Sequence, residues 1–308
     1  MDAADLAVFA AVAGAGGMNR AAQRLHTVQS NVTQHVRRLE AELGVPLFQR
    51  HSRGVTLTAA GARLLPYAQR VGSLLEEARR AATDGAEPAG RLCIGSLETT
   101  AALRMPPILA RYTAAYPRVD LVLQTGTTAS LLQDVLERRL DGALVAGPIQ
   151  HRALLAETVL EEHLVLLAAP GVRDLATHVA ACAKGQGELK LLVFRAGCSY
   201  RVLLERYLAR HGVSNMRRTE LGTLDGIIGC VGAGLGLTLL PRAVVAQAQR
   251  RHQVSVHPFP ASQARVPTQF VRRRDAYVST ALSCFLELAR DQRARQPLAG
   301  GRKMAAGQ

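Results

Sequence analysis

Polar side chains of the kinds that read DNA bases are concentrated between residues 29 and 38. The set combines amides, hydroxyls and guanidinium groups: Gln29, Ser30, Asn31, Thr33, Gln34, Arg37 and Arg38. An amide can bridge the edge of an adenine, a guanidinium group suits guanine or phosphate, and a hydroxyl can contact the sugar–phosphate backbone. These residues predict a surface that binds double-stranded DNA, provided that one element presents them together.

A helix over residues 28–43 would present this polar set on one side. Val32, Val36, Leu39 and Leu43 recur at spacings of four, three and four, which is the pattern of an amphipathic helix. The apolar side would anchor the helix to a small core, and the polar side would stay free for DNA.

Two shorter helices are expected before it. Apolar residues recur at helical spacing over residues 6–13, and the glycine-rich stretch 14–17 ends that helix. Asn19 suits the N-cap of a second helix over residues 20–25. The small pair Ala21 and Ala22 allows another helix to cross closely, so the segment predicts a helix-turn-helix.

A short hairpin that carries two arginines is predicted after the third helix. Gly44 ends the helix, the apolar pair at 47–48 returns to the core, and residues 49–57 form the hairpin. Arg50 and Arg53 would then lie near phosphates or in the minor groove, where the negative potential is strong. The alternative is that both are solvated surface arginines.

This segment resembles the DNA-binding domain of LysR-type transcriptional regulators. The positions that carry the resemblance are Phe9, Ala21, Ala22, Leu25, Gln29, Ser30, Val32, Thr33, Leu39, Glu40, Leu43, Gly44, Leu47, Phe48, Arg50, Leu57, Thr58 and Gly61. The resemblance implies a winged helix-turn-helix over residues 1–58 that binds promoter DNA. One departure is the run Gly17, Met18 and Asn19, where the family commonly has Gly-Ser-Phe followed by Ser or Thr.

A long helical pattern runs from Thr58 to Ala82. Its apolar stripe consists of Leu64, Leu65, Ala68, Val71, Leu74, Leu75 and Ala78. The stripe is longer than one small domain needs, so pairing with a second copy would cover it, as the resemblance also implies. Packing on the effector domain of the same chain is the alternative. Residues 59–90 are therefore predicted to be a linker helix and a hinge.

From residue 91 onward the pattern is that of an α/β domain. Strand patterns at 92–95, 119–125, 164–168 and 191–194 alternate with helical stretches. A looser resemblance to the same family extends over residues 94–96, 109, 116–117, 119, 126, 140–143 and 231–241. It implies two lobes like those of a periplasmic binding protein, with chain crossings near Glu162 and Val266. The expected effector domain, 91–292, then has lobe one at 91–162 and 267–292 and lobe two at 163–266, with the effector in the cleft.

Hydroxyl-rich loops follow the predicted strands and open helices. The residues predicted to bind the effector are Ser96, Thr99, Thr100, Thr127, Thr128, Cys198, Ser199 and Thr223. Free N–H groups at helix starts favour an anion, and nearby arginines favour a small carboxylate, although Glu98 would oppose an anion if it faced inward. The alternative is that the hydroxyls only cap their helices.

Among the five cysteines, Cys198 is the one whose neighbours most suggest a reactive thiol. A helix start and the neighbours Arg195 and Arg201 would favour its thiolate, and its place resembles that of the reactive cysteine in peroxide-sensing family members. The next cysteine, Cys230, is more than thirty residues away, so a resolving partner is not apparent. A pocket thiol is therefore favoured over a peroxide sensor.

Composition limits the other classes of function. The 308 residues carry a net charge of +14, which suggests a polyanionic partner. The apolar start lacks a basic region before it, and no apolar run is long enough to span a bilayer, so a cytoplasmic location with no membrane contact is expected. Residues 293–308 are expected to be a disordered basic tail.

No catalytic residue, metal site or cofactor is predicted. The sequence has no Gly-x-Ser-x-Gly elbow and no His-Glu-x-x-His pattern, and the glycines at 232–236 precede an apolar run instead of following a strand into a helix. A solute receptor and a hydrolase or oxidoreductase are the rival classes, and neither accounts for the first eighty residues. The expected partners are promoter DNA, a small-molecule effector, further copies of the chain and, as an open possibility, RNA polymerase.

Overall fold

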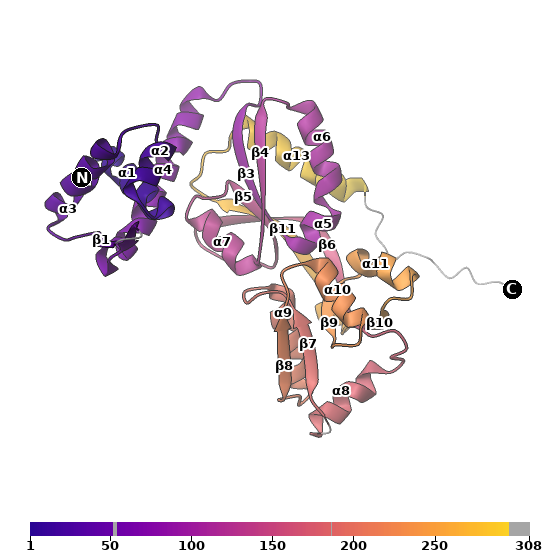
Figure 1. The fold of residues 1–308 in the computed structure, drawn as a ribbon. Coiled ribbons are helices and arrows are strands. Elements are labelled where there is room, and N and C mark those ends of the chain that lie inside the picture. Colours follow the sequence, from indigo (N-terminus) through magenta and orange to yellow (C-terminus); the bar gives the residue numbers. More distant parts are fainter. Residues whose placement is uncertain (52–53, 186, 296–308) are drawn as a thin grey trace. The chain divides into compact units, whose positions relative to one another are not determined.

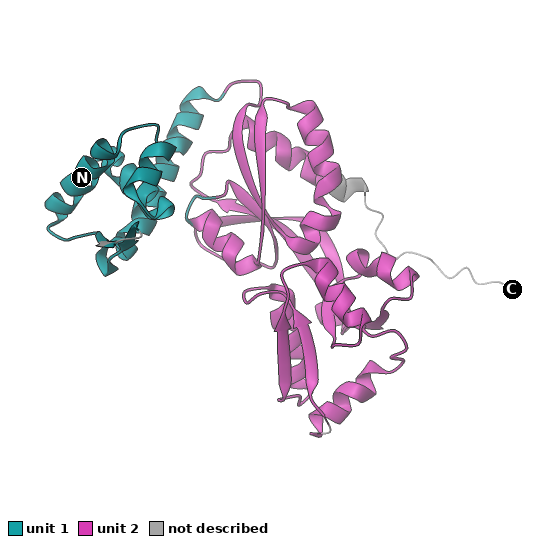
Figure 2. Ribbon diagram, viewed as in Figure 1, with its two compact units in different colours: residues 1–84, 137–139 teal, residues 85–136, 140–308 magenta. Residues whose placement is uncertain are grey.

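The computed structural model describes residues 1–51, 54–185 and 187–295. These residues form two compact units, which we call the first unit (residues 1–84 with 137–139) and the second unit (residues 85–136 and the chain from 140 onward; Figure 2). Of the tail predicted at 293–308, residues 296–308 lie outside the described residues. No described helix is long and apolar enough to cross a membrane.

The first unit follows the predicted order of three helices, a hairpin and a long helix (Figure 1). Its elements are α1 (Ala3–Ala15), α2 (Met18–Arg24), α3 (Gln29–Leu43), β1 (Phe48–His51), β2 (Gly54–Leu57) and α4 (Ala59–Thr83). Phe9 of α1 and Phe48 of β1 meet in the core with ring centroids 5.3 Å apart. The buried residues Val32, Val36 and Leu39 of α3 complete that core, as the sequence pattern predicted.

The predicted N-cap at Asn19 is wrong. The second helix begins at Met18, and its cap position is Gly17, whose side chain can make no capping bond. Gly16 ends α1 with φ +63°, a left-handed conformation that glycine adopts readily. Arg20 then donates from Nε to the Ala15 carbonyl at 2.6 Å and from Nη2 to the Gly16 carbonyl at 2.7 Å. Arg20 satisfies these two carbonyls, and the second helix begins two residues earlier than the sequence suggested.

Close contacts at two glycines join the hairpin and the long helix to the core. A Cβ at Gly54 would lie 2.4 Å from the carbonyl oxygen of Gly16, and one at Gly61 would lie 2.2 Å from that of Leu47. The Thr58 hydroxyl caps α4 by accepting from the Gly61 N–H at 3.0 Å. No other residue type fits at these two positions without displacing backbone.

The second unit is built around one mixed sheet of seven strands. Its main path is β10 (Ser255–Pro258), β6 (Leu154–Ala168), β11 (Arg265–Arg273), β5 (Gly142–Ala146), β3 (Gly90–Leu97) and β4 (Val119–Gly126), and β9 (Thr238–Pro241) also pairs with β6. The strands β4, β3 and β5 are parallel, whereas β11 runs antiparallel to both β5 and β6. A separate parallel pair is formed by β7 (Leu189–Val193) and β8 (Met216–Glu220).

Two groups of elements are joined by the long strands β6 and β11 (Figure 1). The first lobe comprises β3, β4 and β5 with α5 (Glu98–Leu103), α6 (Met105–Ala115), α7 (Thr128–Leu136) and α13 (Thr280–Arg295). The second lobe comprises β7 to β10 with α8 (Leu175–Ala183), α9 (Ser199–Arg210), α10 (Leu224–Gly232) and α11 (Arg242–Arg250), and the short α12 (Ala261–Ala264) precedes β11. Val266 pairs with Glu162 in the register of the joining strands. The exact lobe boundaries given by the sequence stay a prediction.

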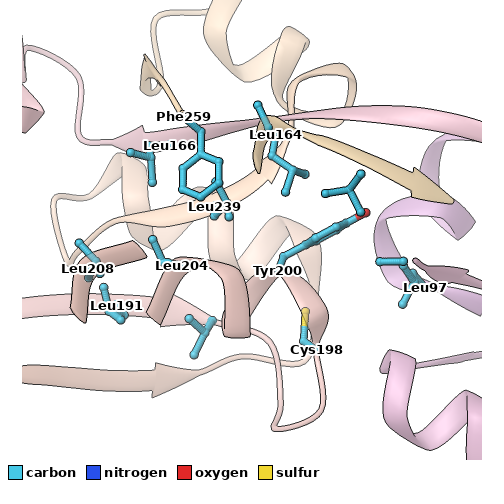
Figure 3. Packing of buried hydrophobic residues seen from close by; sticks show 14 of the residues in the cluster. Leu97, Leu164, Leu166, Leu191, Cys198, Tyr200, Leu204, Leu208, Leu239 and Phe259 are labelled. Carbon is cyan, nitrogen blue, oxygen red and sulfur yellow. The ribbon is translucent and has the colours of Figure 1, made fainter. Parts of the chain in front are cut away.

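Apolar contacts hold each lobe together, and one cluster of buried residues extends from the first lobe into the second. In the first lobe α13 packs on α6, and the Tyr112 hydroxyl donates to the Ala281 carbonyl at 2.8 Å. In the second lobe Leu204, Leu208 and Phe259 pack around β6 and β9 (Figure 3). The glycines after α10 form the predicted turn into β9, where a Cβ at Gly236 would lie 2.5 Å from the Lys190 carbonyl oxygen. The predicted fold class, a winged helix-turn-helix followed by an α/β domain, is confirmed.

Candidate functional site

The polar side of α3 forms an open groove on the first unit. Six of the predicted DNA-binding residues line it together with Ala41: Gln29, Ser30, Thr33, Gln34, Arg37 and Arg38. Asn31 lies outside the groove, where its amide donates to the Thr27 hydroxyl at 3.0 Å. The Thr33 hydroxyl donates to the Gln29 carbonyl at 2.9 Å, so it is already engaged within the helix.

Four side chains in the groove are unengaged. Within the described residues, Gln29, Ser30, Gln34 and Arg37 have no side-chain hydrogen bond or ion pair, and all four are exposed. Two amides, a hydroxyl and a guanidinium group are therefore available to base edges and phosphates.

Arg38 has a role that the sequence did not predict. Its Nε donates to Asp5 Oδ2 at 2.8 Å, and its Nη2 donates to Asp2 Oδ2 at 2.8 Å. His35 Nδ1 lies 2.7 Å from Asp5 Oδ1, and Asp5 is only 1% exposed. The hydrogen bonds from Arg38 hold the pKa of Asp5 below its usual range, although burial opposes them. Arg38 thus ties α3 to α1, which reduces its freedom to contact DNA.

The predicted hairpin, which is the wing of the helix-turn-helix, is confirmed in its backbone only. The strands β1 and β2 pair antiparallel, with Arg50 opposite Val55. Arg53 and the side chain of Arg50 lie outside the described residues, so the contacts predicted for both arginines stay predictions.

A cavity of about 480 Å³ lies between the lobes of the second unit. Four chain segments contribute to it, those after β3, β4, β7 and β8, as the loops after strands were predicted to do. Its lining consists of Leu97, Glu98, Thr99, Thr125, Gly126, Thr127, Ser130, Phe194, Arg195, Ala196, Cys198, Tyr200, Leu221 and Gly222. Thr99, Thr127 and Cys198 are the predicted effector-binding residues among them.

The other five predicted residues do not line the cavity. Ser96 is buried and donates to the Leu97 carbonyl at 3.2 Å, and Ser199 is half-buried behind the lining segment. Thr100 and Thr128 are buried, and neither hydroxyl has a hydrogen-bond partner. Thr223 is exposed and caps α10 by accepting from the Gly226 N–H at 3.2 Å, which is the capping alternative raised by the sequence.

Tyr200 is a lining residue that the sequence analysis missed. Figure 3 shows its ring reaching from the start of α9 toward Leu97 of the first lobe. It is 3% exposed, and its hydroxyl lies beside the hydroxyl of Thr99 but makes no hydrogen bond of normal geometry to any described residue. Burial raises the pKa of the phenol, and the negative charge of Glu162 raises it further. The only signal in the sequence was an aromatic residue at a predicted helix start after a strand.

Two buried hydroxyls in the lining, those of Thr99 and Tyr200, lie next to each other, and neither makes a hydrogen bond of normal geometry to a described residue. A buried polar group without a partner costs about 1 to 3 kcal/mol. Such groups in a cavity of this size are typical of a site that a small polar molecule fills. Beside them, Arg104 and Glu162 form a mostly buried ion pair, with Nε to Oε1 at 3.0 Å and Nη2 to Oε2 at 3.3 Å.

Burial opposes the thiolate that a helix start and neighbouring arginines would favour at Cys198. Burial raises the pKa of the Cys198 thiol, and this effect exceeds the opposing effects of the backbone N–H groups and of Arg201. The positive charge of Arg201 is already compensated, because its guanidinium group pairs with Glu205 at 3.1 Å and with Glu220 at 2.6 Å. The Cys198 side chain lines the cavity, and no described group of His, Cys, Asp and Glu is arranged to hold a metal ion.

Comparison with known proteins places both units in one family. Residues 3–62 match the bacterial regulatory helix-turn-helix model of the lysR family, and residues 85–294 match the LysR substrate binding domain model. The chain belongs to the LysR family of transcriptional regulators. This regulator is 42% identical over 287 residues to the HTH-type transcriptional regulator GltR of Bacillus subtilis (strain 168), covering 93% of this chain and 95% of that protein. It is 38% identical over 287 residues to the HTH-type transcriptional regulator CzcR of Bacillus anthracis, covering 93% of this chain and 96% of that protein.

Solved structures share the fold of the regulator. Full-length OxyR from Pseudomonas aeruginosa superimposes with a TM-score of 0.65 at 23% identity, covering 94% of each chain. Full-length CbnR in complex with its target DNA gives a TM-score of 0.65 at 24% identity, covering 94% of this chain and 99% of that chain. The regulator thus combines a DNA-binding helix-turn-helix with an effector-binding domain.

Proposed function

We propose that this regulator binds promoter DNA as a homo-oligomer and responds to a small molecule that carries an anionic group. One observation carries the proposal: the same chain holds a polar groove on α3 with four exposed, unengaged side chains and a cavity lined by two buried hydroxyls that make no hydrogen bond of normal geometry to a described residue. A solute receptor needs only the cavity, so the groove favours a regulator. Arg195 in the cavity lining supports an anionic group on the effector.

The apolar surface of α4 supports an oligomer. Tyr67, Leu74 and Leu75 are 60%, 50% and 43% exposed, although they belong to a helix whose earlier turns pack into the core. Such residues on a long helix suit pairing with a second copy. A dimer would also place two recognition helices on successive turns of the duplex, which a single α3 cannot do. Contact with RNA polymerase stays a prediction.

The test is a DNA titration with the full-length regulator. A labelled fragment from directly upstream of its own gene is compared with an unrelated fragment of equal length, at several salt concentrations between about 50 and 200 mM. We expect tighter binding to the upstream fragment and a steep loss of affinity as salt rises, because phosphate contacts release counterions. Equal and weak binding to both fragments would contradict the proposed function.

A further inference from the structure

Two ionic side chains of opposite sign line the cavity, one from each lobe. Glu98 comes from the start of α5 in the first lobe, and Arg195 comes from the segment after β7 in the second. Neither side chain has a hydrogen bond or an ion pair within the described part of the chain, and they do not pair with each other. Both charges are therefore available to a ligand.

The other charged groups near the cavity are already neutralised. Arg104 pairs with Glu162, and Arg201 pairs with Glu205 and Glu220. The arrangement thus leaves one carboxylate and one guanidinium group exposed to the cavity and satisfies their neighbours. A ligand with an anionic group alone would satisfy Arg195 and would add a second negative charge beside Glu98. A ligand with a cationic group alone would satisfy Glu98 and would add a second positive charge beside Arg195.

We propose that the effector is a small zwitterion of the amino-acid type, with its ammonium group toward Glu98 and its carboxylate toward Arg195. This inference rests on the proposed function, because it takes the cavity to be the effector site. Opposite charges on one ligand satisfy both side chains at once and bridge the two lobes. The remaining lining suits the rest of such a molecule, since Leu97, Phe194 and Leu221 offer apolar contacts and Thr99 offers a hydroxyl that makes no hydrogen bond of normal geometry to a described residue.

The experiment uses the full-length regulator and matched sets of three compounds. Each set contains an L-amino acid, the carboxylate that lacks its amino group and the amine that lacks its carboxylate; norvaline, pentanoate and butylamine are one set. The common L-amino acids and their analogues are screened by thermal shift, and calorimetry follows on every set that gives a shift. We expect at least one amino acid to bind at least tenfold more tightly than both of its analogues. A carboxylate that binds as tightly as its amino acid, or a screen in which no amino acid shifts the melting temperature, overturns the assignment.

Charge variants then assign the two ends of the ligand. Glu98→Gln is expected to weaken the amino acid at least tenfold and to strengthen the matched carboxylate, whereas Arg195→Gln weakens both. Glu161→Gln and Arg250→Gln, which replace exposed charges outside the cavity lining, serve as controls and should leave affinity unchanged. An amino acid that binds Glu98→Gln as tightly as the wild type would exclude the proposed ammonium contact.

The DNA titration separates this inference from the proposed function. A regulator that binds its upstream fragment but prefers a simple carboxylate retains the proposed function and loses the zwitterion assignment. A chain that binds amino acids through Glu98 and Arg195 but shows no preference for its upstream fragment gives the opposite result.

Discussion

At the scale of single residues, Asp5 shows how a buried charge organises the DNA-binding unit. Arg38 and His35 of α3 both contact its carboxylate, and Asp2, at the N-cap of α1, shares the Arg38 guanidinium group. Breaking a hydrogen bond to a charged group costs about 1.5 to 3 kcal/mol. The position of α3 relative to α1 therefore depends on this one acid.

We expect Asp5→Asn to lower the free energy of unfolding by about 2 kcal/mol at pH 7. Because the folded state lowers the pKa of Asp5, its contribution is present above the unfolded value of about 3.9 and is lost as pH falls through the lower folded pKa. Urea denaturation of wild type and variant should give curves that converge in strong acid. Asp120→Asn, at an exposed position outside this network, is the control, and a pH-independent difference would contradict the argument.

Tyr200 leads to an opposite expectation. Its buried hydroxyl makes no hydrogen bond of normal geometry to a described residue, so Tyr200→Phe should leave the free energy of unfolding unchanged or raise it by about 1 kcal/mol when no effector is present. Tyr112→Phe is the matched control, because that hydroxyl donates to Ala281 and its loss should destabilise the fold. Chemical denaturation without ligand measures both. Destabilisation by Tyr200→Phe equal to that of Tyr112→Phe would mean that the phenol has a partner.

We expect residues of the α3 groove to read bases and the hairpin arginines to contact phosphates. Gln34→Ala should relax sequence preference by about 1 to 3 kcal/mol, because it removes a bidentate contact to a base edge. Arg53→Ala should weaken all sequences similarly and lower the salt slope, if the wing contacts phosphate. DNA titrations at several salt concentrations distinguish the two effects. A change of base preference in Arg53→Ala alone would reverse the assignment.

At the scale of elements, hydrophobic periodicity predicted the helices and strands better than it predicted the contacts between them. The helix expected at 28–43 is α3 at Gln29–Leu43, and the strand expected at 119–125 is β4 at Val119–Gly126, because burial of one side imposes the period. The bond between Asp5 and Arg38 joins residues 33 positions apart and leaves no local pattern. Likewise, strand ends located the cavity, but the side chain that each loop turns toward it depends on packing that the sequence does not reveal.

The proposed oligomer depends on the long helix α4. Leu74→Glu places a charge among exposed apolar residues of the helix, so we expect dimers to dissociate into monomers and affinity for the upstream fragment to fall. Gln69→Glu, an exposed polar position on the same helix, is the control and should have no effect. Light scattering at micromolar concentration measures the state of each. Wild-type protein that is monomeric at this concentration, with full DNA affinity, would remove the reason for the pairing.

At the scale of the whole molecule, the proposed regulation requires that effector binding by the second unit and DNA binding by the first unit are energetically coupled. If the effector changes affinity for DNA by some factor, DNA must change affinity for the effector by the same factor. A ligand can shift the molecule only by its differential affinity for two states. A side chain that supplies much of that difference therefore controls the response without touching DNA.

Thr99 is the side chain for which we expect this behaviour. Its hydroxyl lines the cavity, is buried and makes no hydrogen bond of normal geometry to a described residue, so an effector can satisfy it. Losing a hydrogen bond to a charged ligand costs about 1.5 to 3 kcal/mol, which is comparable to an allosteric coupling of about 1 to 3 kcal/mol. Thr99→Val should therefore abolish the effect of the tightest compound from the amino-acid screen on DNA affinity, while binding to the upstream fragment alone stays intact.

The neighbouring Thr100 provides a matched control for this prediction. Its hydroxyl is also buried and unpartnered, but it does not line the cavity, so Thr100→Val should keep the response. The sequence predicted that both Thr99 and Thr100 bind the effector, and the lining of the cavity favours Thr99. Anisotropy titrations with and without the compound measure both variants. A response lost in Thr100→Val and kept in Thr99→Val would show that the effector contacts the Thr100 hydroxyl, which requires the start of α5 to rearrange when the ligand binds.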